Sequence, residues 1–492
     1  MPRRRFASTD ARLRTRSEAA FRDAARTSEE PDSLNDAERS PHSEQQRRIL
    51  ARLDRLPLWP HDKAVLWVVG FGYLMAFFDI TNVSFALPVF TKVFGLRPAQ
   101  EALPITSSLI GYVVGSWIGS VLADLYGRKR GIFSATLLFS IGSVFTAFSF
   151  SAGAMVVGRL VTGMGIGAEI AVISAYISEM APAGLRGRYT AMANVFAMVG
   201  LGIVPVVALG LVPQFSWGWR AMFLLGSLGL LTFLALPRLP ESPRWLVSKG
   251  RCREAESIIE AAEGRARRRT GRPLLPVPDI PPETESRGFP AAALFRRPFR
   301  KRMTLLLVLW FVWYLGTYAW LGLGPTFFVE RGFSLTRSIV FMLTSSVAFP
   351  LGSLLATAIG DRFERQHIIL AGLLIWTASF VLIGITDSAA VLYVAVFLLS
   401  ISNGCYVPLL YALTAESCPT QARATGVALT DGVGHIGGAV GPVIALAAYQ
   451  WGGIESRFTT VFLFMALSGL ITAMLIPFTI KATRRSLSVS TQ

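Results

Sequence analysis

Residues 124–149 read DLYGRKRGIFSATLLFSIGSVFTAFS, a charged turn followed by a run over 131–149 without a charged side chain. Lipid offers the backbone no hydrogen bonds, so a run of about twenty apolar residues crosses a bilayer as a helix. Similar runs recur along the chain. We predict twelve membrane-spanning helices, over 64–88, 104–123, 131–149, 153–178, 189–212, 219–236, 303–328, 337–359, 367–386, 389–413, 424–449 and 457–479.

The composition argues against a soluble protein of this length. Of 492 residues, 52% are hydrophobic and 16% are charged, whereas soluble domains carry about 25% charged residues. Soluble cores rarely repeat apolar runs of this length so many times. We therefore predict an all-α membrane protein with two groups of six helices.

The N-terminal segment 1–62 has a different character. It is polar, mixes both signs of charge and lacks the apolar stretch of a signal peptide, so we predict a disordered cytoplasmic tail. Cys252, Cys405 and Cys418 indicate no disulfide framework. The chain also lacks HExxH, GxSxG and clustered metal-ligand patterns. We expect no enzyme activity, no cofactor and no metal.

The formal charge of +17 is concentrated in particular connections between helices. If the helices alternate, these connections lie on one side of the membrane. The positive-inside rule then places both termini, the central loop 237–302 and the C-terminal tail 481–492 in the cytoplasm, with the chain in the plasma (inner) membrane. This charge indicates topology and contact with anionic lipid. Nucleic acid is not an expected partner, because no folded basic domain is present.

The two groups of six helices align without gaps at a shift of 237 residues. A single shift that joins charged motifs, glycines and prolines indicates duplication. We predict an N-terminal half over 63–236 and a C-terminal half over 303–480, parallel about an axis along the membrane normal. The matched pairs are Gly115 and Gly352, Asp124 and Asp361, Arg128 and Arg365, Glu179 and Glu416, Pro182 and Pro419, Arg186 and Arg423, Pro88 and Pro325, and Pro205 and Pro442.

These motifs resemble the major facilitator superfamily and, within it, the sugar-porter-like clan. DLYGRK at 124–129 is similar to the superfamily's loop between helices 2 and 3, and PESPRWL at 240–246 to the clan's motif after helix 6. The resemblance covers about residues 60–480 and implies a secondary transporter with alternating access. The helix 4 pattern adds Arg159, Gly163, Gly165, Gly167, Tyr176, Glu179, Pro182, Arg186 and Gly187.

The charged ends of the helices are expected to form a breakable latch at the cytoplasmic face, which holds one inward-closed arrangement. Anchoring of loops among lipid headgroups is the alternative. The latch residues we expect are Asp124, Gly127, Arg128, Glu179, Arg186, Glu241, Arg244, Asp361, Arg365, Glu416 and Arg423.

Two departures from the clan bear on the substrate. Sugar porters usually carry glutamines in helices 5 and 7, where this chain reads AMANVFA at 191–197 and YLGTYAWLG at 314–322. GAE at 167–169 is instead similar to the metabolite–proton symporter and synaptic-vesicle-like branches. A hexose needs many polar partners, so an organic or aromatic acid suits this interior better.

Ionisable residues within the membrane are costly and usually functional. Asp79 in helix 1 and Arg159 in helix 4 lie at similar depths, and the resemblance implies a proton-coupling pair. We expect protonation of Asp79 to release Arg159; a static ion pair is the alternative. Glu169 lies about 15 Å further along helix 4 and is a second proton-coupling candidate, or else a substrate contact or a structural acid.

The substrate cavity has candidates in four helices. Asp431 and His435 lie one turn apart in helix 11 and face the same way, and a neutral packing pair is their alternative role. Tyr314 and Tyr318 show the same spacing in helix 7. The full set we expect in the cavity is Asn82, Asn194, Tyr314, Tyr318, Asp431 and His435.

The function that these features predict is proton symport of a small polar metabolite, most simply an organic or aromatic acid. The expected partners are this substrate, protons and membrane lipids, with the chain acting as a monomer. A sugar porter is the main alternative, and a drug exporter or a transporter-like receptor is a weaker one.

Overall fold

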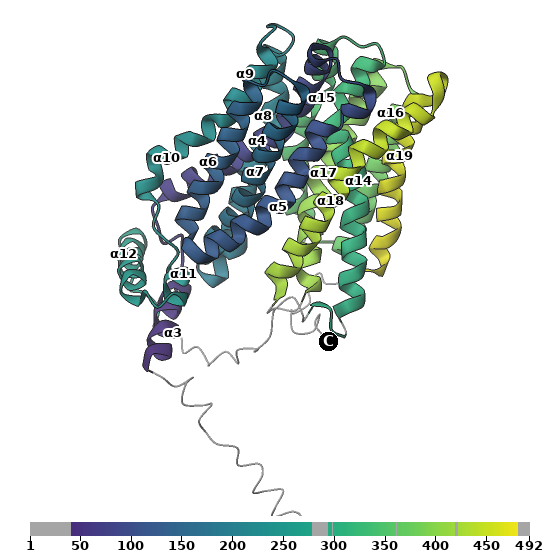
Figure 1. The fold of residues 1–492 in the computed structure, drawn as a ribbon. Coiled ribbons are helices and arrows are strands. Elements are labelled where there is room, and N and C mark those ends of the chain that lie inside the picture. The colour runs from purple at the N-terminus through teal and green to yellow at the C-terminus, as the bar shows by residue number, and fades with distance from the viewer. Residues whose placement is uncertain (1–40, 278–293, 298, 361, 419–421, 481–492) are drawn as a thin grey trace, which may run out of the picture.

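The computed structural model describes residues 41–277, 294–297, 299–360, 362–418 and 422–480. Within these residues the chain is helical and contains no strand. Twelve helices in this described part are long and apolar enough to cross a membrane. The predicted all-α membrane fold is therefore confirmed, and Figure 1 shows its helices as two bundles side by side.

The first bundle begins with α4 (Lys63–Phe94), whose first turn is capped by Asp62 and which ends at Gly95 with a φ of 59°. The helices that follow are α5 (Leu103–Tyr126), α6 (Arg128–Ala147), α7 (Ala152–Met180), α8 (Arg186–Leu211), α9 (Gly218–Gly226) and α10 (Thr232–Ala235). Short 3-10 turns cover Pro98–Gln100, Ala183–Leu185, Ser227–Leu231 and Leu236–Arg238.

The sixth span differs from the single helix predicted over 219–236, because the 3-10 turn Ser227–Leu231 separates α9 from α10. Gly226, just before this turn, and Gly229, within it, pack closely on neighbouring helices. A Cβ at Gly226 would lie 2.9 Å from the Asp79 carboxyl carbon, and one at Gly229 would lie 2.3 Å from the Phe139 ring. The span thereby closes over the acid in α4.

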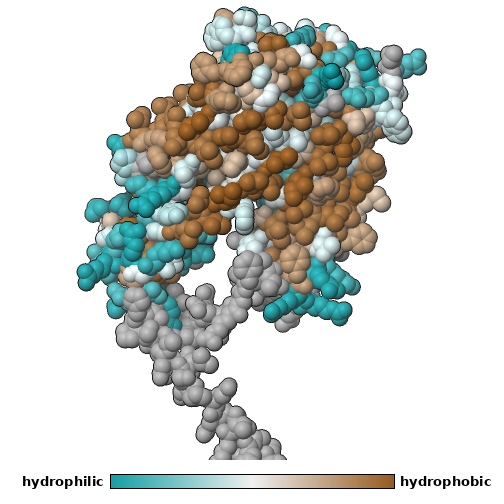
Figure 2. Space-filling model, viewed as in Figure 1, coloured by the Kyte–Doolittle hydropathy of each residue, from teal (hydrophilic) through white to brown (hydrophobic). Residues whose placement is uncertain are grey.

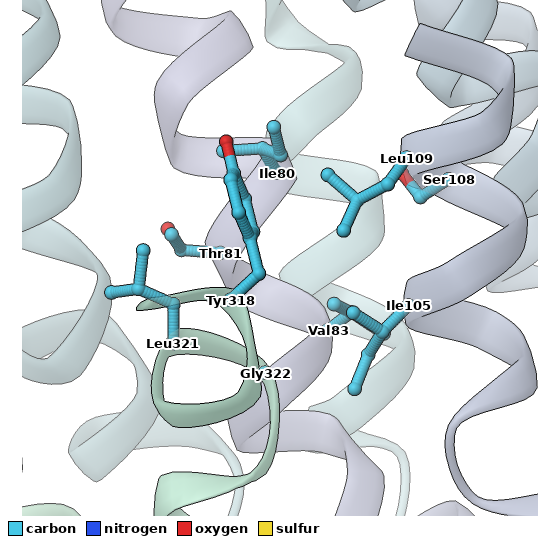
Figure 3. Close-up of a pocket in the computed structure, with 9 residues that line it drawn as sticks. All are labelled: Ile80, Thr81, Val83, Ile105, Ser108, Leu109, Tyr318, Leu321 and Gly322. Carbon is cyan, nitrogen blue, oxygen red and sulfur yellow. The ribbon is translucent and has the colours of Figure 1, made fainter. Parts of the chain in front are cut away.

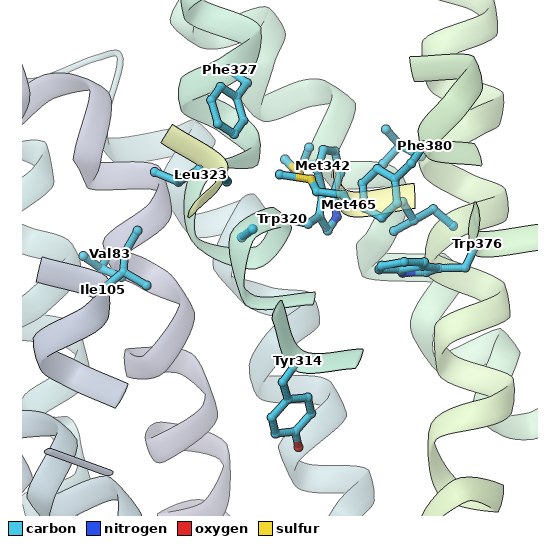
Figure 4. Packing of buried hydrophobic residues seen from close by; sticks show 14 of the residues in the cluster. Val83, Ile105, Tyr314, Trp320, Leu323, Phe327, Met342, Trp376, Phe380 and Met465 are labelled. Carbon is cyan, nitrogen blue, oxygen red and sulfur yellow. The ribbon is translucent and has the colours of Figure 1, made fainter. Parts of the chain in front are cut away.

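The second bundle contains α14 (Phe299–Glu330), α15 (Leu335–Ile359), α16 (Arg365–Ile385), α17 (Ala389–Ser417), α18 (Arg423–Trp451) and α19 (Gly453–Leu475), with a final 3-10 turn over Ile476–Phe478. Its core is aromatic, with Trp320, Trp376 and Phe380 packed together (Figure 4). Val83 and Ile105 of the first bundle belong to the same cluster. The two bundles therefore share one apolar core.

Glycine contacts show the predicted duplication directly. A Cβ at Gly115 of α5 would lie 1.9 Å from the Met164 carbonyl oxygen of α7, and one at Gly352 of α15 would lie 2.2 Å from the Ile401 carbonyl oxygen of α17. Both pairs obey the 237-residue shift. In lipid, helices associate through such small-residue contacts, because hydrophobic burial supplies no driving force there. The two bundles thus pack by the same rule at matching positions.

The segment before α4 and the central segment both contain helices. Residues 41–54 form α3 (Pro41–Asp54), and the predicted loop 237–302 contains α11 (Pro243–Ser248) and α12 (Cys252–Thr270). The expectation of a disordered tail over 1–62 is wrong for 41–62, because α3 buries Ile49 and Leu53 against α12. Residues 1–40 and 481–492 lie outside the described residues.

We name the end of the bundles that carries α3, α11 and α12 the basic face, and the other end the opposite face (Figure 1). Apolar side chains cover the sides of both bundles between these ends, with polar residues gathered at the ends (Figure 2). The bundles touch near the opposite face, where Thr106 donates to the Ala439 carbonyl at 2.7 Å. They diverge toward the basic face.

Candidate functional site

An acid and an arginine lie fully buried in the middle of the first bundle. The Arg159 guanidinium donates to Asp79 Oδ1 at 3.1 Å and to the Asp79 carbonyl at 3.2 Å, and both side chains have 0% exposure. Ser143 donates to the other carboxylate oxygen. A buried charge needs such partners, because desolvation is costly. The pair predicted from matching depth and from the family resemblance is therefore present.

Arg159 also connects this pair to the boundary between the bundles. Its second terminal nitrogen lies 3.1 Å from the Ser108 hydroxyl of α5, and its guanidinium carbon lies 5.5 Å from the Phe223 ring centroid. Ser108 lines a small cavity between α4, α5 and α14, together with Thr81 and Tyr318 (Figure 3). A change at Asp79 can therefore reach that cavity through one side chain.

Asn82 has a different place from the one predicted. It is fully buried and donates to Asp79 Oδ1 at 2.8 Å and to the Met222 carbonyl at 3.2 Å. Asn82 follows Asp79 by one helical turn, so its side chain lies beside the Asp79 carboxylate. It does not line the cavity between α4, α5 and α14, so the expectation that Asn82 lines the substrate cavity is not met by this geometry. It completes the hydrogen bonding of the buried carboxylate.

Glu169 lies apart from this pair. Thr136 donates to one of its oxygens at 3.0 Å, and the other oxygen is buried without a hydrogen-bond partner. Gly72 packs directly on that oxygen, since a Cβ there would lie 2.4 Å away. Glu169 therefore contacts neither Arg159 nor the cavity lining, and its role in proton coupling stays a prediction.

A second polar cluster lies between the bundles around Asp431. Tyr314 and Tyr411 donate to Asp431 Oδ1 at 3.0 Å and 2.7 Å. His435 lies 3.4 Å from Oδ2, and its Nε2 is 2.8 Å from the Tyr318 hydroxyl. The sequence therefore correctly placed Asp431, His435, Tyr314 and Tyr318 in one group.

Tyr112 of the first bundle completes this group. Its ring stacks on His435 with centroids 3.8 Å apart and planes 13° apart, and its hydroxyl donates to Asp431 Oδ2 at 3.3 Å. Sequence reasoning missed Tyr112, Tyr411 and Trp310, which packs on Tyr314 and Tyr411. Trp310 shares the spacing of four with Tyr314 and Tyr318, but spacing gives no signal for Tyr112, which is 319 residues from Asp431.

We call Tyr112, Tyr314, Tyr318, Tyr411, Asp431 and His435 the aromatic site. It draws side chains from α5, α14, α17 and α18, so both bundles build it. Asn194, the counterpart of Asp431 at the 237-residue shift, is exposed on α8. The polar position is thus repeated in sequence, but only the second copy belongs to the aromatic site.

The basic face carries a charge cluster in the first bundle. Arg128 pairs with Asp124 and, at 2.8 Å, with Glu179. Glu241 accepts from the backbone N–H groups of Arg128 and Lys129 at 2.9 and 3.3 Å. Gly127 is required in this turn, because its φ is 109° and a Cβ would lie 2.4 Å from the Glu241 carboxylate.

The second bundle repeats the cluster. Arg365 pairs with Glu416, and Arg423 Nε donates to the Ala415 carbonyl at 3.0 Å. Asp361 lies outside the described residues. In this conformation the ion pairs of these clusters that the structure describes join residues of one bundle, or join α3 to the first bundle and to α11. A latch between the bundles in the closed conformation stays a prediction.

Twelve spans in duplicated halves, a buried acid–arginine pair and a site built by both halves define a secondary transporter of the major facilitator type. The chain belongs to the sugar (and other) transporter family, whose sequence model matches residues 65–487. It is not an enzyme.

Relatives and solved structures agree with this assignment. The chain is 27% identical to the niacin transporter NiaP of Acinetobacter baylyi, over 80% of this chain and 89% of that protein. It is 27% identical to an arabinose-proton symporter of Bacillus subtilis, over 73% and 80%. A crystal structure of a D-xylose-proton symporter shares the fold at a TM-score of 0.69 and 19% identity, covering 85% of this chain and 98% of that one.

Proposed function

We propose that the protein couples the movement of protons to transport of a small organic acid that bears an aromatic ring. The observation that carries this proposal is the aromatic site, in which tyrosine and histidine rings pack around Asp431 beside the cavity that Tyr318 lines. Its hydroxyls converge on one carboxylate, Asp431. Ring faces suit a planar ligand, because offset or edge-to-face aromatic pairs add to the burial energy.

A hexose fits the aromatic site less well, since it would need many separate polar partners. In the aromatic site three tyrosine hydroxyls already donate to Asp431, and a fourth, that of Tyr318, hydrogen-bonds His435. A sugar would have to break these bonds before its own hydroxyls could use the same groups, so the net gain in hydrogen bonding would be small. The similarity to a transporter named for niacin supports an aromatic acid as the substrate.

The proton step of this proposal lies at Asp79. With the carboxylate ionised, Arg159 is held at 3.1 Å. When a proton binds a carboxylate oxygen, that attraction is lost, and the guanidinium is free to strengthen its contact with Ser108 at the cavity. Protonation and the shape of the cavity are thereby linked through Arg159.

The orientation follows from charge. The basic face carries Arg128 and Arg186 of the first bundle, Arg244 of α11 and Arg365 of the second bundle, and such residues are retained on the cytoplasmic side. The bundles diverge toward this face (Figure 1). Both termini would then be cytoplasmic, with the plasma (inner) membrane as the site of action, a single chain as the working unit and anionic lipid around the basic face.

Reconstituted vesicles test the proposal. A pH gradient, acid outside, should drive accumulation of an aromatic acid such as nicotinate or benzoate together with protons. Asp79→Asn should abolish uphill accumulation and retain exchange of labelled for unlabelled substrate. Uphill uptake in that variant would show that Asp79 is not the coupling acid, and uptake without proton movement would refute symport.

A sugar porter remains the second candidate, favoured by the family assignment and by the relative named as an arabinose-proton symporter. Thermal unfolding of the purified protein separates the two candidates, because a ligand stabilises the native state by mass action. Aromatic acids should raise the midpoint and pentoses or hexoses should not. The reverse result would assign the site to sugars.

A further inference from the structure

The helix α3 precedes the segment that the family model matches. The family match begins at residue 65, after α3 (Pro41–Asp54) has ended. The D-xylose-proton symporter structure is covered over 98% of its length by 85% of this chain. What α3 does therefore has to be read from its own contacts.

Apolar residues on one side of α3 dock it on the segment after the first bundle. Ile49 and Leu53 are 2% and 0% exposed, and they share a core with Leu246, Ala255 and Ile259 of α11 and α12. Gln46 also donates to the Val247 carbonyl at 3.3 Å. These contacts fix α3 against the motif that follows the sixth span.

Two arginines hold α3 to α12: Arg52 lies within α3, and Arg55 directly follows it. Arg52 reaches Glu256 and Glu263, each at 3.0 Å, and Arg55 reaches Glu263 at 2.6 Å. Although burial raises the pKa of Glu263, hydrogen bonds from Arg52 and Arg55 hold it below its ordinary value. The carboxylate is therefore ionised at neutral pH and the docking is charge-assisted.

The last residue of α3 reaches into the charge cluster of the basic face. Asp54 Oδ1 lies 2.5 Å from Arg244 and 4.0 Å from Arg186. Both arginines belong to the motifs expected to form the latch, and Arg244 is the arginine of PESPRWL. Burial lowers the pKa of Arg244, and Asp54 opposes that effect. A carboxylate that precedes the matched family segment thus pairs with Arg244 and lies near Arg186, both inside that segment.

If the basic face closes, Arg186 and Arg244 would be needed to attract acidic residues of the other bundle. Closing the basic face would bring the charged ends of the two bundles closer together, with Arg186 at the start of α8 in the first and Glu416 near the end of α17 in the second. A contact shifts a conformational equilibrium only through its difference between the two states. By pairing with Arg244 and lying near Arg186, Asp54 weakens an attraction to the other bundle that would favour the closed state.

We propose that α3 is a built-in brake, which docks on α11 and α12 and uses Asp54 to hold the transporter with its basic face parted. The surface on which α3 docks consists of Leu246, Ala255, Ile259, Glu256 and Glu263. The contact that acts on the conformation is the one that Asp54 makes with Arg244 and, at longer range, with Arg186. Release of α3 makes Arg186 and Arg244 available for closure.

Distance measurements on the full chain test the brake without any substrate. Leu125 and Phe363 are exposed, one in each bundle near the basic face. Each is replaced by cysteine and spin-labelled after the three native cysteines have been removed. The distance between the two labels in lipid nanodiscs then reports how far the basic face is open. Asp54→Asn should increase the population of the short-distance state by roughly fivefold, a usual size for conformational coupling. Glu254→Gln is the matched control: it breaks the exposed Arg251–Glu254 pair on α12 and should leave the distances unchanged.

A second variant keeps the proposal testable if Asp54→Asn does not fold. Leu53→Ser undocks the helix through its apolar side and should produce the same shift, because Asp54 then leaves with α3. If either variant lowers the midpoint of unfolding but has the same label-to-label distances as the parent protein, then α3 only stabilises the fold. That result would refute the brake.

Discussion

The buried pair of Asp79 and Arg159 allows a quantitative prediction. Arg159→Met removes three hydrogen bonds, two to Asp79 and one to Ser108, and leaves the carboxylate with Ser143 and Asn82. Breaking a buried pair in this way usually costs about 3–5 kcal/mol. The loss also has a ceiling, because protonating an aspartate of ordinary pKa 3.9 at pH 7 costs about 4 kcal/mol.

That ceiling predicts a pH dependence. In the Arg159→Met variant the Asp79 carboxyl group is protonated in the folded state. The folded state therefore binds one more proton than the unfolded state does at neutral pH. Its stability should therefore rise as the pH falls, by about 1.4 kcal/mol per pH unit between pH 7 and pH 5. The parent protein should lack this component.

A double-mutant cycle measures the coupling of the pair. We expect the double variant Asp79→Asn/Arg159→Met to recover about 2–3 kcal/mol relative to the sum of the single variants, because neither charge then remains unpaired. Unfolding of purified protein in detergent mixtures, monitored by tryptophan fluorescence, gives the free energies. Additive losses, or a loss in Arg159→Met that does not change with pH, would refute the energetic picture of the pair.

Three further predictions concern other parts of the molecule. Tyr112→Ala should weaken substrate binding by about two- to tenfold in calorimetry through loss of the ring that stacks on His435, and unchanged affinity would exclude Tyr112 from the site. Gly115→Ala should lower the free energy of unfolding by about 1–3 kcal/mol, since its Cβ would meet α7 backbone, whereas Gly153→Ala, with open space around it, should have no such effect. Burial, together with Arg265, lowers the pKa of His61 to about 3. The stability that neutral His61 contributes is therefore fully present above the unfolded-state pKa near 6.5, and the free energy of unfolding should fall on acidification, by about 1.4 kcal/mol at pH 5.5. A His61→Phe variant with the same pH profile as the parent protein would contradict this.

Much of the architecture could be predicted from residue order. A membrane span depends on the length and hydropathy of one continuous segment, and the positions of the twelve spans required no knowledge of neighbours. The 237-residue shift predicted the two halves, and the matching contacts at Gly115 and Gly352 follow that shift. Asp79 and Arg159 could be paired because charged residues within the membrane are rare and their depths match.

Contacts between distant segments were decided by the tertiary structure alone. Tyr112 stacks on His435 only because two bundles meet there, and no spacing within one helix records that meeting. Asn82 lies one turn from Asp79 on the same helix, but its contact with the Met222 carbonyl, 140 residues away, depends on the rotation of α4 against its neighbours. The polar segment before residue 63 looked disordered by composition, yet α3 within it is ordered by contacts with α12 some 200 residues away.

The twelve spans and the duplicated charge motifs were therefore determined by the sequence itself, because each depends on local hydropathy or on a repeat that residue order displays. The aromatic site and the contact of Asp54 with Arg244 were decided only by the folded chain. The physical reason is that a site's chemistry depends on which side chains share a volume, and packing rather than sequence distance sets that volume.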